Sequence, residues 1–461
     1  MNNITLLLSY LLENEYINNN ELSNINNLIS TNNISFPITI DDKAIFIYED
    51  ENISSKTMQE IFIVGDFNQW QLTTKMQKLP NSNIYFQILT FEPDGRFDYR
   101  FVVNNQWILD PKNKLICHGG FGYNSELRMP KFVENKYFHY NANYVHGTII
   151  YHELFSKILN KEYKIKVYTP NGYLKGKKLP ILFIQDGFEY IDYAKCNNQL
   201  DNLINENLIT HALAVFIKPN DRNNEYAYNE TDLYIKFFVE ELLEFINVNY
   251  SLPDETNDYH LLGADFGANI SLKIALMYPD KFHNLYLHSP QLWPNNYEVL
   301  NLLDKADNKN LFIFSIYGKY EKNPNNDYNF IFEKLRKYST NIKVEIYNQG
   351  HGWGLWKNTL HHLLKDALTV EKVTNPSHCK LSIDFDNESK HLQINLFLNS
   401  IYDIEVNIFN LMGKIILPIF NGKKEAGNHR IDVILNDLPA NIYIVSLKVM
   451  NKTFIQKFNI S

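Results

Sequence analysis

The stretch Tyr259-His-Leu-Leu-Gly-Ala-Asp-Phe-Gly-Ala-Asn-Ile-Ser271 decides how this chain folds. It begins with an apolar run typical of a buried strand and leads into an apolar helix over residues 270–277, which ends before Tyr278-Pro279-Asp280. Small residues surround the corner between the two: Gly263, Ala264, Gly267 and Ala268. Such residues let the backbone hold one exposed side chain in a strained turn. Here that side chain is Asp265.

Strands and helices alternate on both sides of this corner, from about residue 137 to residue 368. Further strands are predicted at residues 163–170, 179–187, 212–218, 285–290, 311–318 and 343–347, and an amphipathic helix at residues 234–248. This alternation favours a parallel sheet covered by helices on both faces. The sequence therefore predicts a doubly wound α/β domain over residues 133–370.

Several motifs follow one another along this segment: Asp186-Gly187 at the end of a strand, Arg222-x-x-Glu225-Tyr226, the corner at Asp265, Ser289-Pro290-x-x-Trp293, and Gly350-His351-x-Trp353-x-x-Trp356. Their order resembles an esterase family of α/β hydrolases that includes enterochelin esterases, esterase D, and feruloyl and acetyl-xylan esterases. In that family the corner is the nucleophile elbow, G-x-S-x-G. The resemblance implies an α/β-hydrolase fold.

The resemblance also implies roles for individual side chains. Asp265 stands where the family has its serine nucleophile, and His351 stands where the family has its general base. Glu321 fits the place of the acid that orients the base, with Asp327 as the second choice. The predicted catalytic set is therefore Asp265, His351 and Glu321.

The residues around the elbow complete the predicted site. The backbone N–H groups of Phe266 and Gly187 would form the oxyanion hole. The side chains that the resemblance places in or behind the cleft are Arg222, Glu225, Tyr226, Ser289 and Trp293. Of these, Arg222 and Glu225 are predicted to form a structural ion pair.

The aspartate at the corner leaves three alternatives open. A carboxylate is already ionised and needs no base for attack, but it is a weak nucleophile towards esters. The first alternative is an esterase-like protein that is inactive or strongly altered and binds a ligand or glycan. The second is a hydrolase in which Asp265 attacks an sp³ carbon and His351 activates water. The third is an ordinary ester hydrolase, yet Ser271 lies within the helix and Ser289 on another strand, so neither replaces the missing serine.

Residues 36–132 contain short strands separated by turns, which predicts a β-sandwich. The motifs Gly65-Asp-Phe-Asn-Gln-Trp70 and Gln106-Trp107 resemble the glycogen-binding, early-set module found beside isoamylases, branching enzymes and kinase regulatory subunits. The side chains that the resemblance places in a sugar-binding platform are Trp70, Arg100, Trp107 and Asn124. Indole faces stack on sugar rings, and polar side chains bond to hydroxyl groups. The tryptophans could instead only pack within the fold, and the sequence leaves both readings open.

Residues 380–461 also predict a β-sandwich, with strands at 380–385, 391–398, 404–409, 431–435 and 442–449. The run Val406-Asn-Ile-Phe-Asn-Leu-Met-Gly-Lys414 and the later Leu-Pro-Ala-Asn-Ile-Tyr resemble the C-terminal sorting domain of the type IX secretion system in Bacteroidetes, with Asn441 in place of the usual glycine. Residues 371–379 predict a linker, and residues 1–35 a helical, Asn-rich leader. The sorting-domain resemblance implies a secreted or cell-surface protein, whereas the lack of a signal-peptide pattern favours the cytoplasm.

The composition narrows the remaining possibilities. The 461 residues carry a formal net charge of −8, and Lys and Arg are scattered among Asp and Glu, so nothing predicts binding to nucleic acid. The three cysteines are far apart and lack metal-ligand spacing, so neither a disulfide framework nor a metal site is predicted. No apolar run is long enough to span a membrane. We expect no cofactor, and a glycan or small ester as the ligand.

Overall fold

The computed structural model describes residues 35–50, 60–120, 122–303, 311–321, 328–338, 341–369, 379–398, 402–425, 427–449 and 452–461. The chain divides into two compact units, Met1–Thr369 and Val370–Ser461, and each is described by itself. The predicted leader up to residue 34, the predicted linker up to residue 378, and Asp327 lie outside the described residues.

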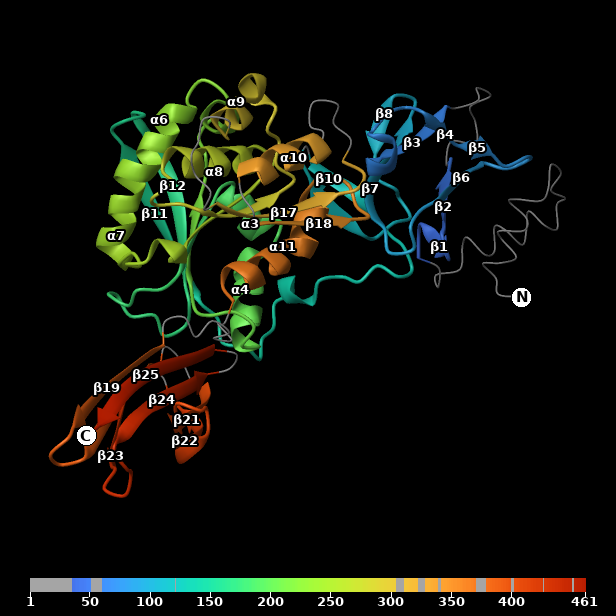
Figure 1. The fold of residues 1–461 in the computed structure, drawn as a ribbon. Helices are drawn as coiled ribbons and strands as arrows, with labels where there is room; N and C mark the ends of the chain where they lie inside the picture. Colours follow the sequence, from blue (N-terminus) through green and yellow to red (C-terminus); the bar gives the residue numbers. More distant parts are fainter. Residues whose placement is uncertain are drawn as a thin grey trace. The chain divides into compact units, whose positions relative to one another are not determined.

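The N-terminal β-sandwich consists of two antiparallel sheets (blue to cyan in Figure 1). The strand order in the first sheet is β1 (Ile38–Ile40), β2 (Lys43–Glu49), β6 (Ile84–Thr90) and β5 (Gln77–Lys78). The order in the second is β4 (Thr74–Lys75), β3 (Ile61–Gly65), β7 (Arg96–Val103), β10 (Gly122–Arg128) and β9 (Ile116–Gly119), with β8 (Gln106–Ile108) paired to β7. Phe46 from the first sheet and Phe97 from the second belong to the same buried core.

The central sheet of eight strands follows in the chain. The strand order is β11 (Thr148–Ser156), β12 (Lys161–Thr169), β14 (Leu213–Ile217), β13 (Ile181–Ile184), β15 (Tyr259–Ala264), β16 (Asn284–His288), β17 (Phe312–Gly318) and β18 (Asn341–Tyr347). All pairings from β14 to β18 are parallel, and β11 and β12 are antiparallel. The carboxyl ends of the parallel strands therefore meet along one edge of the sheet.

Helices cover both faces of this sheet (Figure 1). The helical elements of this domain are α3 (Gly187–Asp192), α4 (Cys196–Asn205), α5 (Arg222–Ala227), α6 (Thr231–Lys236), the π-helical turn η3 (Phe237–Leu242), α7 (Leu243–Tyr250), α8 (Phe266–Met277), α9 (Pro294–Leu303), α10 (Tyr328–Tyr338) and α11 (Trp353–Ala367), with short 3-10 turns η2 (Lys136–Phe138) and η4 (Thr256–Asp258). Another 3-10 turn, η1 (Asp66–Asn68), lies in the N-terminal sandwich. Neighbouring strand residues point to opposite faces: Leu261 packs in the core with η3 and α8, and Leu262 packs in the core with α4 and α11.

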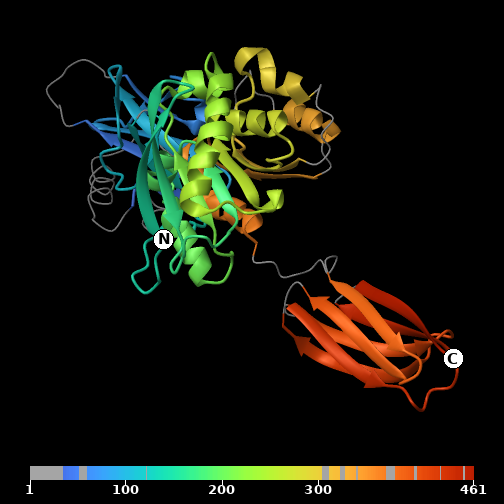
Figure 2. The ribbon, with the colours of Figure 1, turned by 90° about the vertical axis from the view of Figure 1, so that its left-hand side faces the viewer.

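The C-terminal unit is a second β-sandwich (orange to red in Figure 2). One sheet has the order β19 (Lys380–Asp386), β20 (His391–Leu398) and β23 (Gly427–Ile434). The other has the order β22 (Ile415–Lys424), β21 (Tyr402–Asn410), β24 (Asn441–Val449) and β25 (Lys452–Ile460). The fold class predicted from the sequence, a doubly wound α/β-hydrolase sheet with a β-sandwich before and after it in the chain, is confirmed.

The N-terminal sandwich packs on the two loops that follow β17 and β18. The backbone N–H of Arg96 donates to the carbonyl oxygen of Asn348 at 3.0 Å, and Asn348 Nδ2 donates to Asp94 Oδ1 at 2.8 Å. Tyr320 donates from its hydroxyl to Glu92 Oε2 at 2.6 Å and packs its ring edge-on against Phe97, with ring centroids 4.8 Å apart. The sandwich thus holds both the loop after β17, which carries Glu321, and the loop after β18, which carries His351.

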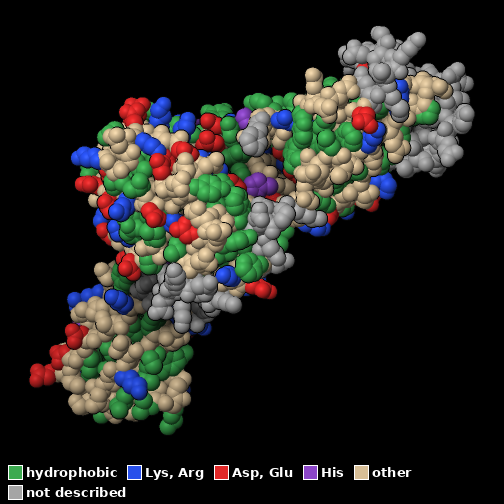
Figure 3. All heavy atoms as spheres, turned by 90° about the horizontal axis from the view of Figure 1, so that it is seen from above, with side chains coloured by type: hydrophobic (Ala, Val, Ile, Leu, Met, Phe, Trp, Pro, Cys, Tyr) green, Lys and Arg blue, Asp and Glu red, His purple; other side chains and the backbone are tan. Residues whose placement is uncertain are grey.

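Two surface properties follow from the described residues. None of the helices among them is long and apolar enough to cross a membrane. On the face drawn in Figure 3, basic and acidic side chains are interspersed, without a large patch of one sign.

Candidate functional site

Asp265 occupies the sharp turn between β15 and α8. Its backbone angles are φ 55° and ψ −117°, a conformation that costs free energy for any residue with a side chain. The turn needs small neighbours, since a Cβ atom on Gly263 would lie 2.3 Å from the carbonyl oxygen of Gly267. The backbone N–H of Asp265 donates to the carbonyl oxygen of His288 at 3.0 Å and ties the turn to β16. The predicted elbow is thus present, with a carboxylate at its tip.

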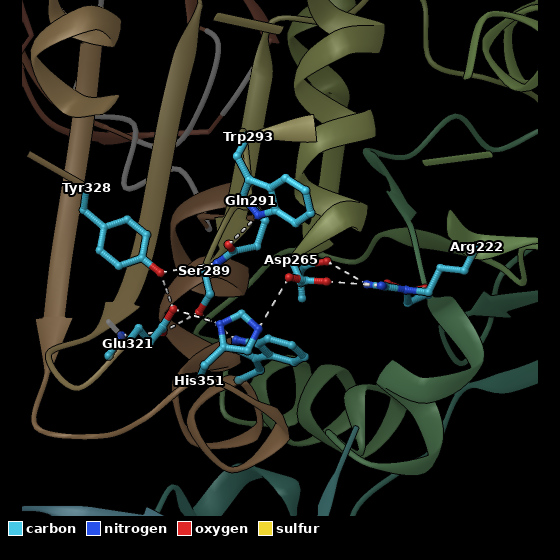
Figure 4. Close-up of polar contacts among 12 residues, drawn as sticks. Arg222, Asp265, Ser289, Gln291, Trp293, Glu321, Tyr328 and His351 are labelled. Atoms are coloured by element: carbon cyan, nitrogen blue, oxygen red, sulfur yellow. Dashed lines mark hydrogen bonds and ion pairs between the residues drawn. The ribbon is translucent and has the colours of Figure 1, made fainter. Parts of the chain in front are cut away.

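His351 lies between Asp265 and Glu321 (Figure 4). Its Nδ1 atom is 2.9 Å from Glu321 Oε2, and its Nε2 atom is 3.5 Å from Asp265 Oδ1. Glu321 follows β17 and His351 follows β18, so both come from the edge of the sheet where the elbow lies. The structure brings together all three residues predicted to be catalytic.

Glu321 is a buried, fully engaged carboxylate. It accepts hydrogen bonds from Ser289 Oγ, from the backbone N–H of Gly318 and from Tyr328 Oη, each at 2.6 Å. Ser289 in turn accepts from Trp356 Nε1 at 2.9 Å. These contacts fix the orientation of Glu321, and through Nδ1 they fix the His351 ring.

Arg222 holds Asp265 from the other side (Figure 4). Its Nε and NH2 atoms donate to the two carboxylate oxygens of Asp186 at 2.8 Å each, and its NH1 atom donates to Asp265 Oδ2 at 3.1 Å. The predicted ion pair with Glu225 was wrong. Glu225 is buried instead, accepts from Tyr163 Oη at 2.8 Å and lies 3.7 Å from Lys161 Nζ, so its charge is paired elsewhere.

The charges of the site stabilise one another. Burial alone would lower the pKa of His351, but the charge of Glu321 and the contact with Asp265 raise it to about 10. Burial alone would raise the pKa of Asp265, but His351 and then Arg222 hold it below its usual value. At neutral pH the site therefore contains an ionised Asp265 beside a protonated His351, and a protonated imidazole cannot accept a proton as a general base.

The residues predicted to form the oxyanion hole begin two neighbouring helices. Phe266 is the first residue of α8, which follows β15. Gly187 is the first residue of α3, which follows the adjacent strand β13. The backbone N–H of Phe266 favours the charged carboxylate of Asp265 and lowers its pKa. One predicted oxyanion donor thus already faces a negative charge within the protein.

The other predicted cleft residues divide into two groups. Trp293 lines the pocket and packs edge-on against Phe266, with ring centroids 5.6 Å apart. Ser289, Glu225 and Tyr226 are completely buried behind it, and Tyr226 Oη accepts from the backbone N–H of Asp186 at 3.2 Å. Ser289 and Tyr226 brace the site through Glu321 and Asp186 without lining it. The polar partners of Glu225 are Tyr163, Asn220 and Lys161, which lie outside the pocket lining.

A pocket of about 310 Å³ opens above Asp265. The central domain lines it with Asp265, Phe266, Gln291, Trp293, Tyr320, Glu321, Tyr328 and His351, and the N-terminal sandwich with Asp66, Gln69 and Trp70. Sequence reasoning missed Asp66, Gln69, Gln291, Tyr320 and Tyr328 as lining residues. Gln291 lies inside the motif that ends at Trp293, which was a usable signal, but nothing in the sequence places the sandwich over the elbow.

The residues predicted to bind a glycan lie together on the N-terminal sandwich. Trp70 and Trp107 stack with ring centroids 6.3 Å apart and an interplanar angle of 19°, and Trp107 is 45% exposed. Arg100 Nε donates to Asn124 Oδ1 at 2.9 Å. Asn124 is buried, and its Nδ2 donates to Asp98 Oδ2 at 3.0 Å, so its carboxamide positions Arg100.

No group of His, Cys, Asp and Glu that could hold a metal occurs in the described part of the chain.

The strand order and the elbow define an α/β-hydrolase fold, and the residue at the tip of its elbow is an aspartate in contact with an imidazole. Comparison with protein families agrees with this class. Residues 156–367 match the family described as "Putative esterase". Residues 55–121 match the glycogen recognition site of AMP-activated protein kinase, and residues 375–461 match the secretion system C-terminal sorting domain. The three resemblances predicted from the sequence are therefore confirmed, and the chain combines an esterase-type domain, a carbohydrate-binding module and a secretion sorting tail.

Individual proteins resemble separate parts of the chain. The uncharacterized protein YjcH of Bacillus subtilis (strain 168) is 27% identical over 241 residues, which are 48% of this chain and 98% of that protein. The beta-2 subunit of human 5'-AMP-activated protein kinase is 36% identical over 58 residues, 13% of this chain and 20% of that protein. The enterobactin esterase FES of Shigella flexneri has the same fold, with a TM-score of 0.60 at 19% identity over 70% of this chain and 92% of that chain.

Proposed function

We propose that this protein binds a glycan or a small ester ligand in the pocket above Asp265 and has lost ordinary ester hydrolysis. The observation that carries the proposal is the position of the Asp265 carboxylate, 3.1 Å from Arg222 and 3.5 Å from His351. Two cationic neighbours reduce the nucleophilicity of the carboxylate, and His351 is held in its protonated form. The stacked Trp70 and Trp107, within the segment that matches a glycogen recognition site, support a glucan as the ligand.

The first test is the turnover of aryl acetates and feruloyl esters. We expect the rate of the wild-type protein to equal that of the His351→Ala variant and of buffer, because the elbow has no hydroxyl group for His351 to activate. Release of 4-nitrophenol or ferulate, followed by absorbance, measures this rate. Appreciable wild-type turnover that His351→Ala abolishes would contradict the proposal.

A second candidate function uses Asp265 covalently. The carboxylate is partly exposed to the pocket, and Glu321 still orients His351 at 2.9 Å. Asp265 would attack an sp³ carbon, the leaving group would depart with the bonding electrons, and an alkyl ester would form. Esterification removes the charge of Asp265, so the pKa of His351 would fall and the ring could take a proton from water. Attack of that water on the ester carbonyl would release the alcohol.

This candidate predicts a label on one residue. Single-turnover reaction with a primary alkyl bromide in ¹⁸O-water should place ¹⁸O in the Asp265 carboxylate, detected by mass spectrometry of the peptide. His351→Ala should instead retain the alkyl ester as a mass increase on the same peptide. Product formation without label on Asp265 rules out this function.

A further inference from the structure

Trp70 belongs to two surfaces at once. It stacks on the exposed Trp107, and it lines the pocket that contains Asp265. Gln69, the residue before it, also lines the pocket from the sandwich side. The predicted sugar platform and the pocket above the elbow are therefore adjacent and share a side chain.

The lining of the pocket suits a neutral ligand rich in hydroxyl groups. Aromatic rings offer faces for the C–H surfaces of sugars, and the amides of Gln69 and Gln291 with the carboxylate of Asp265 offer partners for hydroxyls. Among the described residues that line the pocket there is no Lys or Arg. An anionic ligand would face the carboxylates of Asp265 and Glu321, and the cations beside them, His351 and Arg222, are already paired with carboxylates.

The surroundings of Asp66 favour its neutral form. Its carboxyl is buried against Gly350, and its Oδ2 atom accepts from the backbone N–H of Asp98 at 2.8 Å. Burial, followed by the charge of Asp98, raises the pKa of Asp66 to about 8. Gln69 and Trp70 carry no charge, so the side of the pocket formed by the sandwich presents little negative charge to a ligand.

The floor of the pocket is closed by residues at the ends of the central strands. Asp265, Glu321 and His351 follow β15, β17 and β18 respectively, with α8 behind the elbow. Ser289, which donates to Glu321, is completely buried, so a chain that reaches the elbow from the platform has no path through the central sheet. The platform lies on the surface, where Trp107 is 45% exposed, and accepts the side of a chain.

We propose that one neutral glucan chain binds along both surfaces, lying across Trp107 and Trp70 and ending in the pocket above Asp265. This inference rests on the proposed function, in which the pocket binds its ligand without cleaving it as an ester. It assigns the pocket to a chain end and the platform to the preceding sugars.

Calorimetric titration with two sugars of the same chemistry tests the inference. Maltoheptaose is linear and has ends, whereas β-cyclodextrin is a ring of the same sugar and has none. We expect Trp107→Ala to weaken binding of both by about tenfold, because each loses an aromatic stacking face. We expect Trp293→Ala to weaken maltoheptaose by about tenfold and to leave β-cyclodextrin unchanged, because only a chain end reaches the pocket. Phe155→Ala, which removes a 57% exposed aromatic side chain from β11, should change neither.

Each result supports or overturns the inference. If Trp293→Ala leaves maltoheptaose unchanged while Trp107→Ala weakens both sugars, the glucan stays on the platform and the inference is wrong. Binding of neither sugar to the wild-type protein overturns it as well. Thermal unfolding checks the fold of each variant. If Trp293→Ala unfolds, Gln69→Asn replaces it, because Gln69 has a φ of 55° and asparagine tolerates this backbone conformation. Failure of the proposed function is seen separately, in the ester turnover assay, which contains no glucan.

Discussion

Replacing Asp265 by serine should create an ester hydrolase from this protein. The serine hydroxyl oxygen would stand at the tip of the elbow, in the place of Asp265 Cγ, and His351 Nε2 lies 3.5 Å from the Oδ1 atom that is bonded to this carbon. Glu321 orients the other ring nitrogen at 2.9 Å. Positioned general-base catalysis contributes about 10²–10⁴-fold, so we expect Asp265→Ser to hydrolyse 4-nitrophenyl acetate at least about 10²-fold faster than the wild-type protein.

The pKa of His351 should change in the same variant. Asp265 is one of two carboxylates that raise this pKa to about 10, and Glu321, the stronger cause, remains. Its pKa should therefore fall, which increases the neutral fraction that can act as a base near pH 8. The substitution also removes the charge that faces the backbone N–H of Phe266, so this donor becomes available to a developing oxyanion.

Two further variants separate these effects. Asp265→Asn removes the charge without supplying a nucleophile, so the pKa of His351, followed by NMR titration of the ring protons, should fall while the turnover stays at the wild-type level. Asp265→Ser combined with His351→Ala should lose the gained activity. A folded Asp265→Ser variant that is no more active than Asp265→Asn would show that the oxyanion hole or the pocket no longer fits an ester.

Replacing Arg96 by methionine should cause the largest loss of stability among the substitutions considered. Arg96 is 2% exposed and forms ion pairs with Asp98 Oδ1 at 2.6 Å and Glu126 Oε2 at 3.2 Å. Its guanidinium packs against Gly354, where a Cβ atom would lie 1.9 Å from NH1. Removing one partner of a buried ion pair leaves an uncompensated charge, so we expect the free energy of unfolding in urea at pH 7 to fall by about 3–5 kcal/mol.

The loss should depend on pH in a defined direction. Burial opposes ionisation of Glu126, but Arg96 and Arg128 lower its pKa from 4.5 to about 2. A carboxyl with a lowered pKa stabilises the folded state fully above its unfolded pKa and loses this contribution as the pH falls towards the folded value. The Arg96→Met variant lacks the stabilisation that Arg96 gives to ionised Glu126, so lowering the pH removes it only from the wild-type protein. The difference in unfolding free energy between the two proteins should therefore shrink between pH 5 and pH 2.

Arg128→Met is the matched control. Arg128 contacts the same Glu126 carboxylate and also Glu134 at 2.6 Å, but its side chain is 27% exposed and hydrated. We expect it to cost about 1 kcal/mol or less. Equal losses for the two arginines, or a difference between Arg96→Met and wild type that does not change with pH, would contradict this account of the buried pair.

The elbow was predictable because its requirements are local. Small residues at Gly263 and Gly267 are needed by the contacts of the turn itself, so their spacing in the sequence is sufficient evidence. His351 and Glu321 were found from their order after late strands, and the parallel sheet brings such positions to one edge. The helix after the elbow begins at Phe266 and not at residue 270, since the helix starts immediately after the strained residue.

The partners of Arg222 were not predictable in the same way. Glu225 lies three positions later on the same helix, a spacing at which an arginine and an acid can pair. The structure places Arg222 beside Asp186 and Asp265, which follow the neighbouring strands β13 and β15. Only the strand order of the sheet makes these two acids adjacent, and a local pattern does not contain this order.

In the central sheet and the C-terminal sandwich, three strands were missed for a related reason. β11 and β25 have several exposed apolar residues, among them Phe155 and Ile455, so neither shows a clear alternation of buried and exposed positions. β22 contains Pro418 and Gly422, which interrupt the pattern of a strand, and its pairing with β21 has irregular register. All three were recognised only through their hydrogen-bonded neighbours.

The packing of the N-terminal sandwich on the loops after β17 and β18 changes what counts as one functional piece of this chain. The segment matched by the esterase family is a unit of ancestry, but it lacks one wall of its own pocket and the external support of its histidine loop. The boundary of the segment shared with the esterase family therefore differs from the boundary of the part that builds the pocket. A recombinant segment cut at the family boundary would contain Asp265, His351 and Glu321 without the surroundings that position them, so the smallest piece suitable for biochemistry begins with the sandwich.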